Sequence, residues 1–296
     1  MGQLQHFRPT IWSRNFIVNL DKAFVFRNIV NTNYEGEITG YGNIVKINEI
    51  GDITVNDYTE DSNITYQTLT DAQKELVIDQ KKYFAFEIDD VAVAQANVSV
   101  MQSAMQKAAH SVGDVIDQFI AELWKEHGLT TSNFGDSSTG TTLYAISTSA
   151  MSILQLITKM HQFLDEANAP ALGRWAVLTP AMHAYLKYAG ITDNLTGNLK
   201  RDDGTPVGPG FIGSLLGFDF FSSNNVDKDT STPPVKRVMF GVPDAISFAG
   251  QVTKIEPVRR DARFADAVRG LYVYGAKVVR PDYLGVAFVE PSGLST

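Results

Sequence analysis

Three glycines, Gly208, Gly210 and Gly213, have the G-x-G-x-x-G spacing of a dinucleotide-binding loop. Such a loop binds pyrophosphate because it follows a strand and opens a helix, whose first N–H groups face the phosphates. Here the preceding residues 202–206 predict a turn, and residues 215–221 after the loop predict a strand. We therefore expect a flexible glycine loop that holds no cofactor.

The other reactive residue types do not gather into a catalytic or metal-binding pattern. The absence of cysteine excludes disulfides, thiol catalysis and cysteine-ligated metals. The five histidines include no i, i+4 pair with the glutamate of a helical zinc site, and neither a Walker A nor a G-x-S-x-G motif occurs. The acidic pair Asp89–Asp90 is typical of a strand end that offers a helix N-cap. The sequence thus predicts no catalytic residue, no cofactor and no metal.

Composition is that of a folded protein with a sizeable core. Of 296 residues, 44% are hydrophobic and 20% are charged. No apolar run approaches the roughly 18 residues of a membrane span, and the N-terminus lacks the pattern of a signal peptide. We expect a cytoplasmic protein without membrane contact. The formal net charge of -8 argues against an extensive phosphate-binding surface.

The element that organises the chain is a long amphipathic helix over residues 99–127, which contain no proline and a single glycine, Gly113. At about 1.5 Å per residue it is on the order of 45 Å long and spans a flat subunit from edge to edge. Asp117 is among the positions that require water or a polar partner. Seven apolar residues at steps of three and four predict one buried face: Met101, Met105, Ala108, Val112, Val115, Phe119 and Leu123.

Residues 36–89 predict a two-stranded arm with a polar tip. Strands are expected at residues 44–50 and 53–58, and a long returning strand is expected at residues 75–89. An isolated two-stranded ribbon is marginal in water, so the arm is expected to rest on another body, such as a neighbouring subunit. A long helix with a projecting arm favours a protein that tiles a surface over one that encloses a small substrate.

The remaining segments predict a mixed α/β pattern. A first helix is expected over residues 9–30, and a Gly/Ser/Thr-rich connector over residues 128–142. Between the connector and residue 242 we expect two helices, at residues 149–167 and 180–188, and three strands, at residues 174–179, 215–221 and 237–242.

The C-terminal region predicts a hairpin. Two apolar runs, residues 271–280 and 283–289, flank Pro281–Asp282, whose proline favours a turn. Before the hairpin, residues 254–269 carry a basic run with interspersed acids. We expect a solvated or inter-subunit charge patch there, because aromatic residues for base stacking are sparse.

Eight short segments have a distinctive order and spacing. They are residues 11–13 (IWS), 34–38 (YEGEI), 42–48 (GNIVKIN), 69–71 (LTD), 86–91 (FEIDDV), 94–97 (AQAN), 267–271 (AVRGL) and 274–281 (YGAKVVRP). Together they resemble the major capsid proteins of tailed double-stranded DNA bacteriophages, which have the Hong Kong 97-type fold. The resemblance covers most of the chain and is weaker from residue 128 to residue 235.

The resemblance implies an α+β fold with an N-terminal arm, an extended β-hairpin loop, a long spine helix and a mixed α/β axial domain. It divides the chain into four parts: an N-terminal arm (residues 1–35), an extended loop that overlaps a neighbour (36–86), a peripheral domain with the spine helix (87–139 and 250–275), and an axial domain with the C-terminal strands (140–249 and 276–296).

The implied function is structural, not enzymatic. Many copies, as pentamers and hexamers, would close into an icosahedral phage head that encloses double-stranded DNA without sequence-specific binding. The expected partners are a separate scaffolding protein, because the chain has no N-terminal scaffolding extension, and a portal. The protein would reside in the virion after assembly in the host cytoplasm.

Six residues are expected to make inter-subunit contacts: Trp12, Arg14 and Arg27 on the first helix, and Lys81, Lys82 and Glu87 on the arm. For the charged ones, simple solvation is the alternative. Two other functions remain open. An encapsulin-like compartment shell would use the same fold to enclose enzymes. A nucleotide-binding α/β enzyme would use the Gly208–Gly213 loop.

Overall fold

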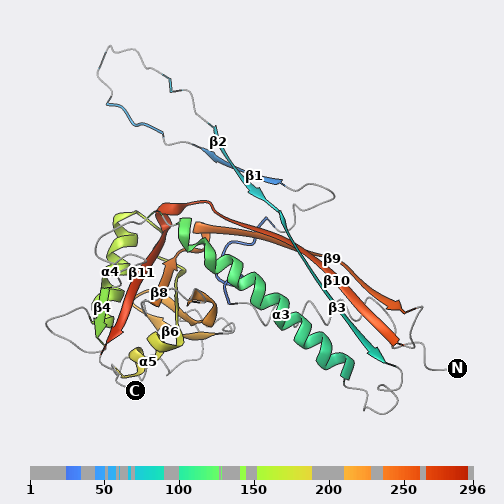
Figure 1. Cartoon of the computed structure of the whole chain (residues 1–296). Helices are drawn as coiled ribbons and strands as arrows, with labels where there is room; N and C mark the ends of the chain where they lie inside the picture. The colour runs from blue at the N-terminus through green and yellow to red at the C-terminus, as the bar shows by residue number, and fades with distance from the viewer. Residues whose placement is uncertain are drawn as a thin grey trace.

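The chain forms a long helix beside a three-stranded sheet, a second and larger sheet, and an arm that projects away from both, as the computed structural model in Figure 1 shows. This mixture of helix, antiparallel sheet and mixed sheet confirms the predicted α+β class. The structure describes residues 25–34, 44–50, 53–57, 60, 66–67, 71–89, 100–126, 128, 141–144, 152–188, 210–227, 236–260 and 265–292.

The predicted spine helix is present as α3 (Val100–Glu122), which continues as the 3-10 turn η3 (Leu123–Glu126). Its apolar face is displaced from the predicted one, since Val115 is 39% exposed. The displacement arises because α3 packs on two sides: Phe119 meets Tyr274 of the three-stranded sheet edge to face at 5.3 Å, and the helix also contacts the larger body. The buried side chains of the helix include Met105, Ala109, Val112, Ile116 and Ile120.

The three-stranded sheet is antiparallel, in the order β3-β10-β9. Its strands are β3 (Gln80–Asp89), β10 (Ala265–Val278) and β9 (Ile246–Arg259). Since β9 and β10 are consecutive and paired, the basic run of residues 254–269 lies at the far end of this hairpin.

The prediction of one strand over residues 75–89 is wrong. The chain divides at Ile78 and Asp79 into β2 (Asp71–Val77) and β3. The division is required because the two strands belong to different sheets: β2 pairs with β1 (Ile44–Ile50) in the arm, whereas β3 pairs with β10. The two-stranded arm therefore ends at Val77, short of the predicted Asp89.

The larger sheet has six strands in the order β4-β11-β8-β5-β7-β6, and helices α4 and α5 follow the predicted mixed α/β pattern. Its elements are β4 (Thr141–Tyr144), α4 (Ile153–Glu166), β5 (Arg174–Leu178), α5 (Pro180–Tyr188), β6 (Phe211–Leu215), β7 (Phe218–Ser222), the 3-10 turn η5 (Asn224–Asp227), β8 (Lys236–Gly241) and β11 (Leu284–Ser292).

The predicted single strand at residues 215–221 is instead the β6–β7 hairpin. Its turn residues, Leu216 and Gly217, have φ values of 50° and 78°. Two consecutive left-handed residues give the turn whose twist matches that of paired antiparallel strands. The sequence pattern does not reveal this turn, because Leu216 is as apolar as the strand residues on either side of it.

The predicted C-terminal hairpin is also wrong. β10 pairs with β3 and β9, whereas β11 pairs with β8 and β4. Between them, the 3-10 turn η7 (Pro281–Tyr283) carries the chain from one sheet to the other. The Pro281 carbonyl accepts a hydrogen bond from the Gly128 N–H at 2.9 Å. Proline sets a turn here, as its fixed φ predicts, but the strands on either side diverge.

Two predictions near the N-terminus also fail where they are described. Residues 25–30 form turns rather than the end of the predicted first helix. Residues 53–57 are extended but are not paired as a strand. The rest of that first helix, residues 9–24, lies outside the described residues.

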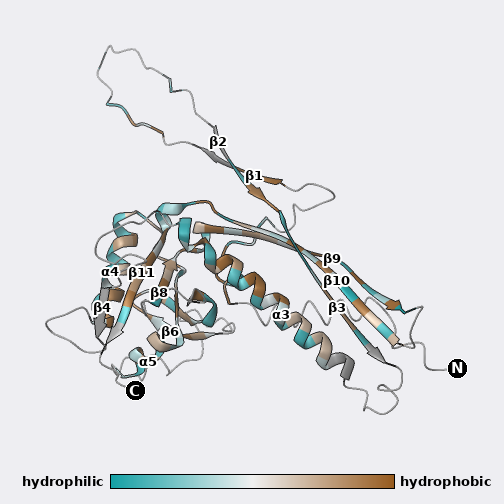
Figure 2. Cartoon of the chain, in the orientation of Figure 1, coloured by the Kyte–Doolittle hydropathy of each residue, from teal (hydrophilic) through white to brown (hydrophobic). Residues whose placement is uncertain are grey.

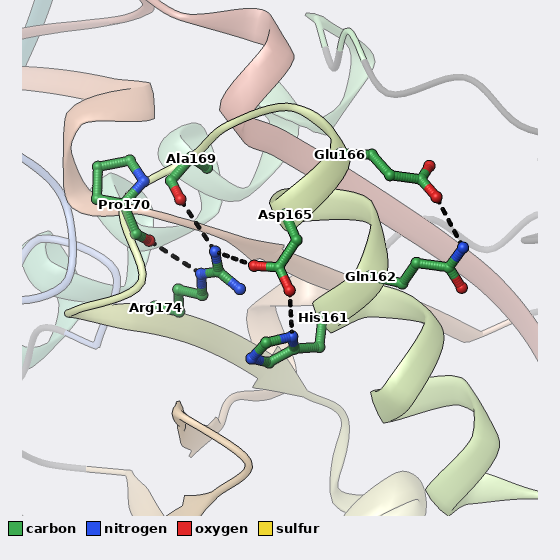
Figure 3. A network of polar contacts seen from close by, with 7 residues as sticks. All are labelled: His161, Gln162, Asp165, Glu166, Ala169, Pro170 and Arg174. Atoms are coloured by element: carbon green, nitrogen blue, oxygen red, sulfur yellow. Dashed lines mark hydrogen bonds and ion pairs between the residues drawn. The ribbon is translucent and has the colours of Figure 1, made fainter.

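A buried ionic network joins the end of α4 to β5 (Figure 3). Arg174 is 1% exposed. Its Nε donates to the Pro170 carbonyl at 2.9 Å, and its Nη2 donates to the Ala169 carbonyl at 2.9 Å and to the Asp165 carboxylate at 2.7 Å. His161 Nδ1 also contacts Asp165 at 2.9 Å. The hydrogen bond from Arg174 is the main reason that the pKa of Asp165 lies below its usual value.

We expect Arg174→Ala to lower the free energy of unfolding by about 3 kcal/mol, because it leaves a cavity and removes the donor to two carbonyls. Denaturant unfolding measures the change. The matched control is Gln162→Ala on the same helix, which removes only a bond to the exposed Glu166 and should cost about 0.5 kcal/mol or less. Equal losses in the two variants would contradict the assignment.

Candidate assembly surfaces

The β1–β2 arm has one face on the body and one face in solvent. Val45 and Ile47 are buried at 5% and 7% exposure, and Leu76 and Ile78 on the returning strand are buried at 0% and 2%. These four side chains pack with Ala249 and Val279 in a small core of their own. The alternate positions point outward, as the two-residue period of a strand requires.

The outward side of the arm carries large apolar side chains. Ile44 and Val77 are 49% and 45% exposed. Farther out, Ile53, Val55 and Tyr66 are 69%, 92% and 92% exposed. Figure 2 shows hydrophobic residues both on β1 and farther out along the arm. A projecting ribbon with apolar residues on its free side is typical of a surface that another chain covers.

The root of the arm crosses the body at a close backbone contact. Lys74 Nζ donates to the Val279 carbonyl at 2.6 Å. Directly beside it, the Val77 carbonyl oxygen and the Ile78 backbone lie where a β-carbon on Gly275 would be. Only glycine leaves room for this crossing. The direction in which the arm leaves the body therefore depends on Gly275.

The solvent face of the three-stranded sheet is the second candidate surface. On β3, the exposed residues Lys81, Tyr83, Ala85 and Glu87 alternate with half-buried aromatic residues. Tyr83 is 80% exposed. These positions lie opposite residues 267–273 of β10, so the two strands contribute to one face.

Ion pairs cross this face and its far end. The Glu256 carboxylate pairs with Lys254 and, at 2.7 Å, with Arg269 on the adjacent strand. Hydrogen bonds from Lys254 and then Arg269 lower the pKa of Glu256 below its usual value. Arg259 pairs with Asp266 at 2.9 Å. The described part of the predicted charge patch, residues 254–260 and 265–269, thus contains ion pairs both within β9 and between β9 and β10.

The structure brings together only part of the predicted contact set. Lys81 and Lys82 are exposed near the start of β3. Glu87 lies at the other end of the strand, 3.3 Å from Arg260 of the same chain. Arg27 is half-buried in a turn beside α3. Trp12 and Arg14 lie outside the described residues.

The glycine loop does not have the geometry of a phosphate site. Gly210 has a φ of 80°, and a β-carbon there would lie 2.8 Å from the Ser222 carbonyl oxygen. The chain after it enters β6, so no helix N-terminus follows. Gly208 lies outside the described residues. Gly210 and Gly213 therefore serve an edge strand of the larger sheet.

A cleft of about 410 Å³ lies between the end of α3 and η5. The Arg237 guanidinium is 4.8 Å from the centre of the Trp124 ring, which meets Phe288 edge to face at 5.6 Å. Glu122 and Lys125 also line it, but the described lining residues include no histidine, serine or second carboxylate. The cleft therefore lies where polar side chains of the helix meet those of the larger body. Its described lining residues do not include a nucleophile paired with a base.

Among the described residues, no three histidine, aspartate or glutamate side chains gather as a metal site. No helix in the described part of the chain is long and apolar enough to cross a membrane.

One polar residue with a structural role escaped the sequence reasoning. Asp117 was predicted to require water or a polar partner; it is 1% exposed, and its partner is the Val25 N–H, which the sequence did not indicate. The available signal was its spacing, because Gly113 and Ala121, four residues before and after it, are both buried. A carboxylate inside such a row of small residues requires a partner from another segment.

The model of the phage capsid protein family matches residues 73–289. Among solved structures, the chain is similar to that of Mycobacterium phage Che8, with a TM-score of 0.64 and 28% identity over 90% of this chain and 91% of that chain. No curated protein sequence matches it.

Two further structures share the fold alone. The capsid of cyanophage P-SCSP1u has a TM-score of 0.62 and 16% identity, over 92% of this chain and 89% of that chain. A virus-like particle from Pyrococcus furiosus has a TM-score of 0.55 and 13% identity, over 96% and 100%. Since the family match spans well over half of the sequence, the chain belongs to the phage capsid protein family, as a structural major capsid protein of the Hong Kong 97-type fold that forms a phage shell.

Proposed function

We propose that this protein closes into an icosahedral head of pentamers and hexamers around double-stranded DNA, and that the β1–β2 arm joins neighbouring subunits. The observation that carries the proposal is the exposure of Ile53, Val55 and Tyr66 on the arm. Nothing in the described part of the chain covers these side chains, so we infer that a second copy buries them. Stability of the shell then exceeds that of the subunit.

The solvent face of the three-stranded sheet is the proposed seat of the neighbour's arm. Lys81 and Arg269 give this face exposed cations, whereas Lys82, exposed at the start of the strand, belongs to the opposite face of β3. The arm carries the exposed acids Asp57 and Glu60. Charge complementarity of this kind fixes register and excludes wrong partners more than it adds affinity. Glu87, Arg27, Trp12 and Arg14 remain proposed contacts at the edges of this overlap.

The proposed domains keep the boundaries that the resemblance implies. A peripheral domain of residues 87–139 and 250–275 contains α3 and most of the three-stranded sheet. An axial domain of residues 140–249 and 276–296 contains the larger sheet. Residues 1–35 and 36–86 are the proposed N-terminal arm and extended loop.

Partners and location follow from the proposed shell. A separate scaffolding protein would set its size, and a portal would occupy one vertex. A net charge of -8 suits a container whose DNA must leave without adhering to the wall. The protein would be assembled in the host cytoplasm, would remain in the virion, and would carry no enzymatic activity.

Negative-stain electron microscopy of the purified protein, alone and co-expressed with its natural gene neighbours, tests the proposal. We expect closed shells, tubes or capsomer rings in at least one of the two preparations. Nuclease-resistant DNA in mature heads distinguishes a DNA container from a protein container. A persistent monomer or dimer in both preparations would contradict the proposed assembly.

Charge reversal on β3 tests the seat of the arm. In the variant Lys81→Glu, we expect the yield of shells to fall about ten-fold or more, because like charges then face the acidic arm. Sedimentation measures the yield. Lys81→Arg keeps the charge and should assemble normally, and Lys82→Glu, on the opposite face of the same strand, should impair assembly less. Both lysines are exposed, so thermal unfolding of the subunit should be unchanged; unimpaired assembly of Lys81→Glu would refute this seat.

The close crossing at Gly275 gives another prediction. Gly275→Ala places a β-carbon against the Val77 carbonyl, so the root of the arm must move. We expect a cost of about 2 kcal/mol in unfolding free energy and malformed or absent shells in micrographs. Lys277→Ala, two residues along the same strand and exposed, is the control and should assemble normally. Regular shells from Gly275→Ala would show that the crossing does not direct the arm.

A further inference from the structure

Residues 25–34, which we call the strap, are fastened to the body at two places. Phe26 is fully buried in the main core, with Ile29 and Val30 beside it at 4% and 6% exposure. Farther along, the Asn31 N–H donates to the carbonyls of Pro243 (3.1 Å) and Ile246 (3.0 Å) at the start of β9. The strap therefore connects the spine helix to the beginning of the three-stranded sheet (Figure 1).

The first fastening is a buried carboxylate. Asp117, in the middle of α3, accepts the Val25 N–H at 2.7 Å through its Oδ2. Its side chain is 1% exposed, and its Oδ1 is buried without a hydrogen-bond partner among the described residues. Val25 itself packs against Gly210, where a β-carbon would lie 3.1 Å from its Cγ2. The closed strap thus removes the Asp117 carboxyl from water and satisfies only part of it.

We propose that Asp117 and the strap form a proton-dependent latch, which is closed most firmly when Asp117 is protonated and opens more readily when its carboxylate is ionised. Burial without full hydrogen bonding penalises the ionised form, whereas an open strap exposes the carboxyl to water. The latch sets how firmly residues 25–34 are held against α3.

The pKa of Asp117 is shifted in the direction that its burial requires. Loss of hydration raises the pKa of Asp117 to about 7, although the backbone N–H groups of Val25, Arg27 and Phe26 oppose the shift. Asp114, one turn earlier on α3, adds a smaller upward contribution.

Arg27 and Tyr274 are two other described ionisable groups near the latch. Arg27, on the strap, stays protonated. Tyr274 of β10 packs on Phe119, two residues from Asp117, and burial raises its pKa above the ordinary value. Asp117 is therefore the group whose titration is expected to move the strap.

The sign of the effect follows from linkage. The closed state binds the proton more tightly than the open state, where the pKa of an aspartate is about 3.9. Closure is therefore most stable below about pH 4, weakens as pH rises toward 7, and is constant above it. Between pH 5 and 8 the opening equilibrium constant is expected to increase on the order of a hundred-fold.

Amide hydrogen exchange of the full-length protein measures this opening. Protection factors of residues 25–31, corrected for the intrinsic pH dependence of exchange, are expected to fall as pH rises from 5 to 7 and to level off above 7. Amides of the central strand β5 serve as the internal reference and should not change with pH. Strap protection that is constant from pH 5 to 8 would overturn the proposal.

Two variants isolate the carboxyl. Asp117→Asn keeps an oxygen for the Val25 N–H but cannot ionise, so strap protection should become independent of pH. Glu122→Gln, on the same helix and exposed, should keep the wild-type pH dependence. A pH response that persists in Asp117→Asn would overturn the assignment. If that variant fails to fold, the wild-type pH series with its β5 reference still decides between the two outcomes.

Discussion

The apolar stripe of α3 is the contact on which the rest of the subunit is built. Its buried residues belong to one continuous core that also contains Trp175 of the larger sheet and Tyr274 of the three-stranded sheet. The helix lies along the three-stranded sheet, contacting β3, and meets the larger body at η5, so it links the two bodies (Figure 1). The end of the helix adds a second joint, where Trp124 packs between Arg237 and Phe288. A single helix that fastens both bodies suits a plate-like building block whose parts must keep a common orientation.

The arm stands apart from this core. Its root has a separate small cluster around Leu76 and Ile78, and its outer residues are exposed in the subunit. Folding of the body and docking of the arm are therefore distinct events, the first within one chain and the second between chains. A capsid protein needs this separation. If the arm buried its apolar side chains within its own chain, no apolar surface would remain for contact with a neighbouring subunit. Gly275 links the two events by setting the direction of the arm.

Buried charges hold the segments that the apolar core cannot specify. Arg174 is 1% exposed; its Nε and Nη2 donate to two carbonyls and to the Asp165 carboxylate, whereas its Nη1 is buried without a partner among the described residues. Asp117 is equally buried, and its Oδ1 also lacks a partner among those residues. The two sites differ in their chemistry: a guanidinium stays protonated, whereas a carboxyl group can titrate, so only the Asp117 contact is expected to respond to pH.

Local pattern in the sequence was enough to predict α3, α5, β1 and β5, because helix and strand periodicity depend on neighbouring residues. Lys81 was predicted as a contact between subunits and is exposed, but the sequence did not indicate its partner, since contacts between copies depend on the assembled shell. Tertiary structure alone decided that β2 and β3 separate, that β10 and β11 join different sheets, and that Asp117 is buried. Strand pairing and the burial of a charge both depend on contacts between segments far apart in the chain. Local periodicity in the sequence does not show which of the possible pairings forms.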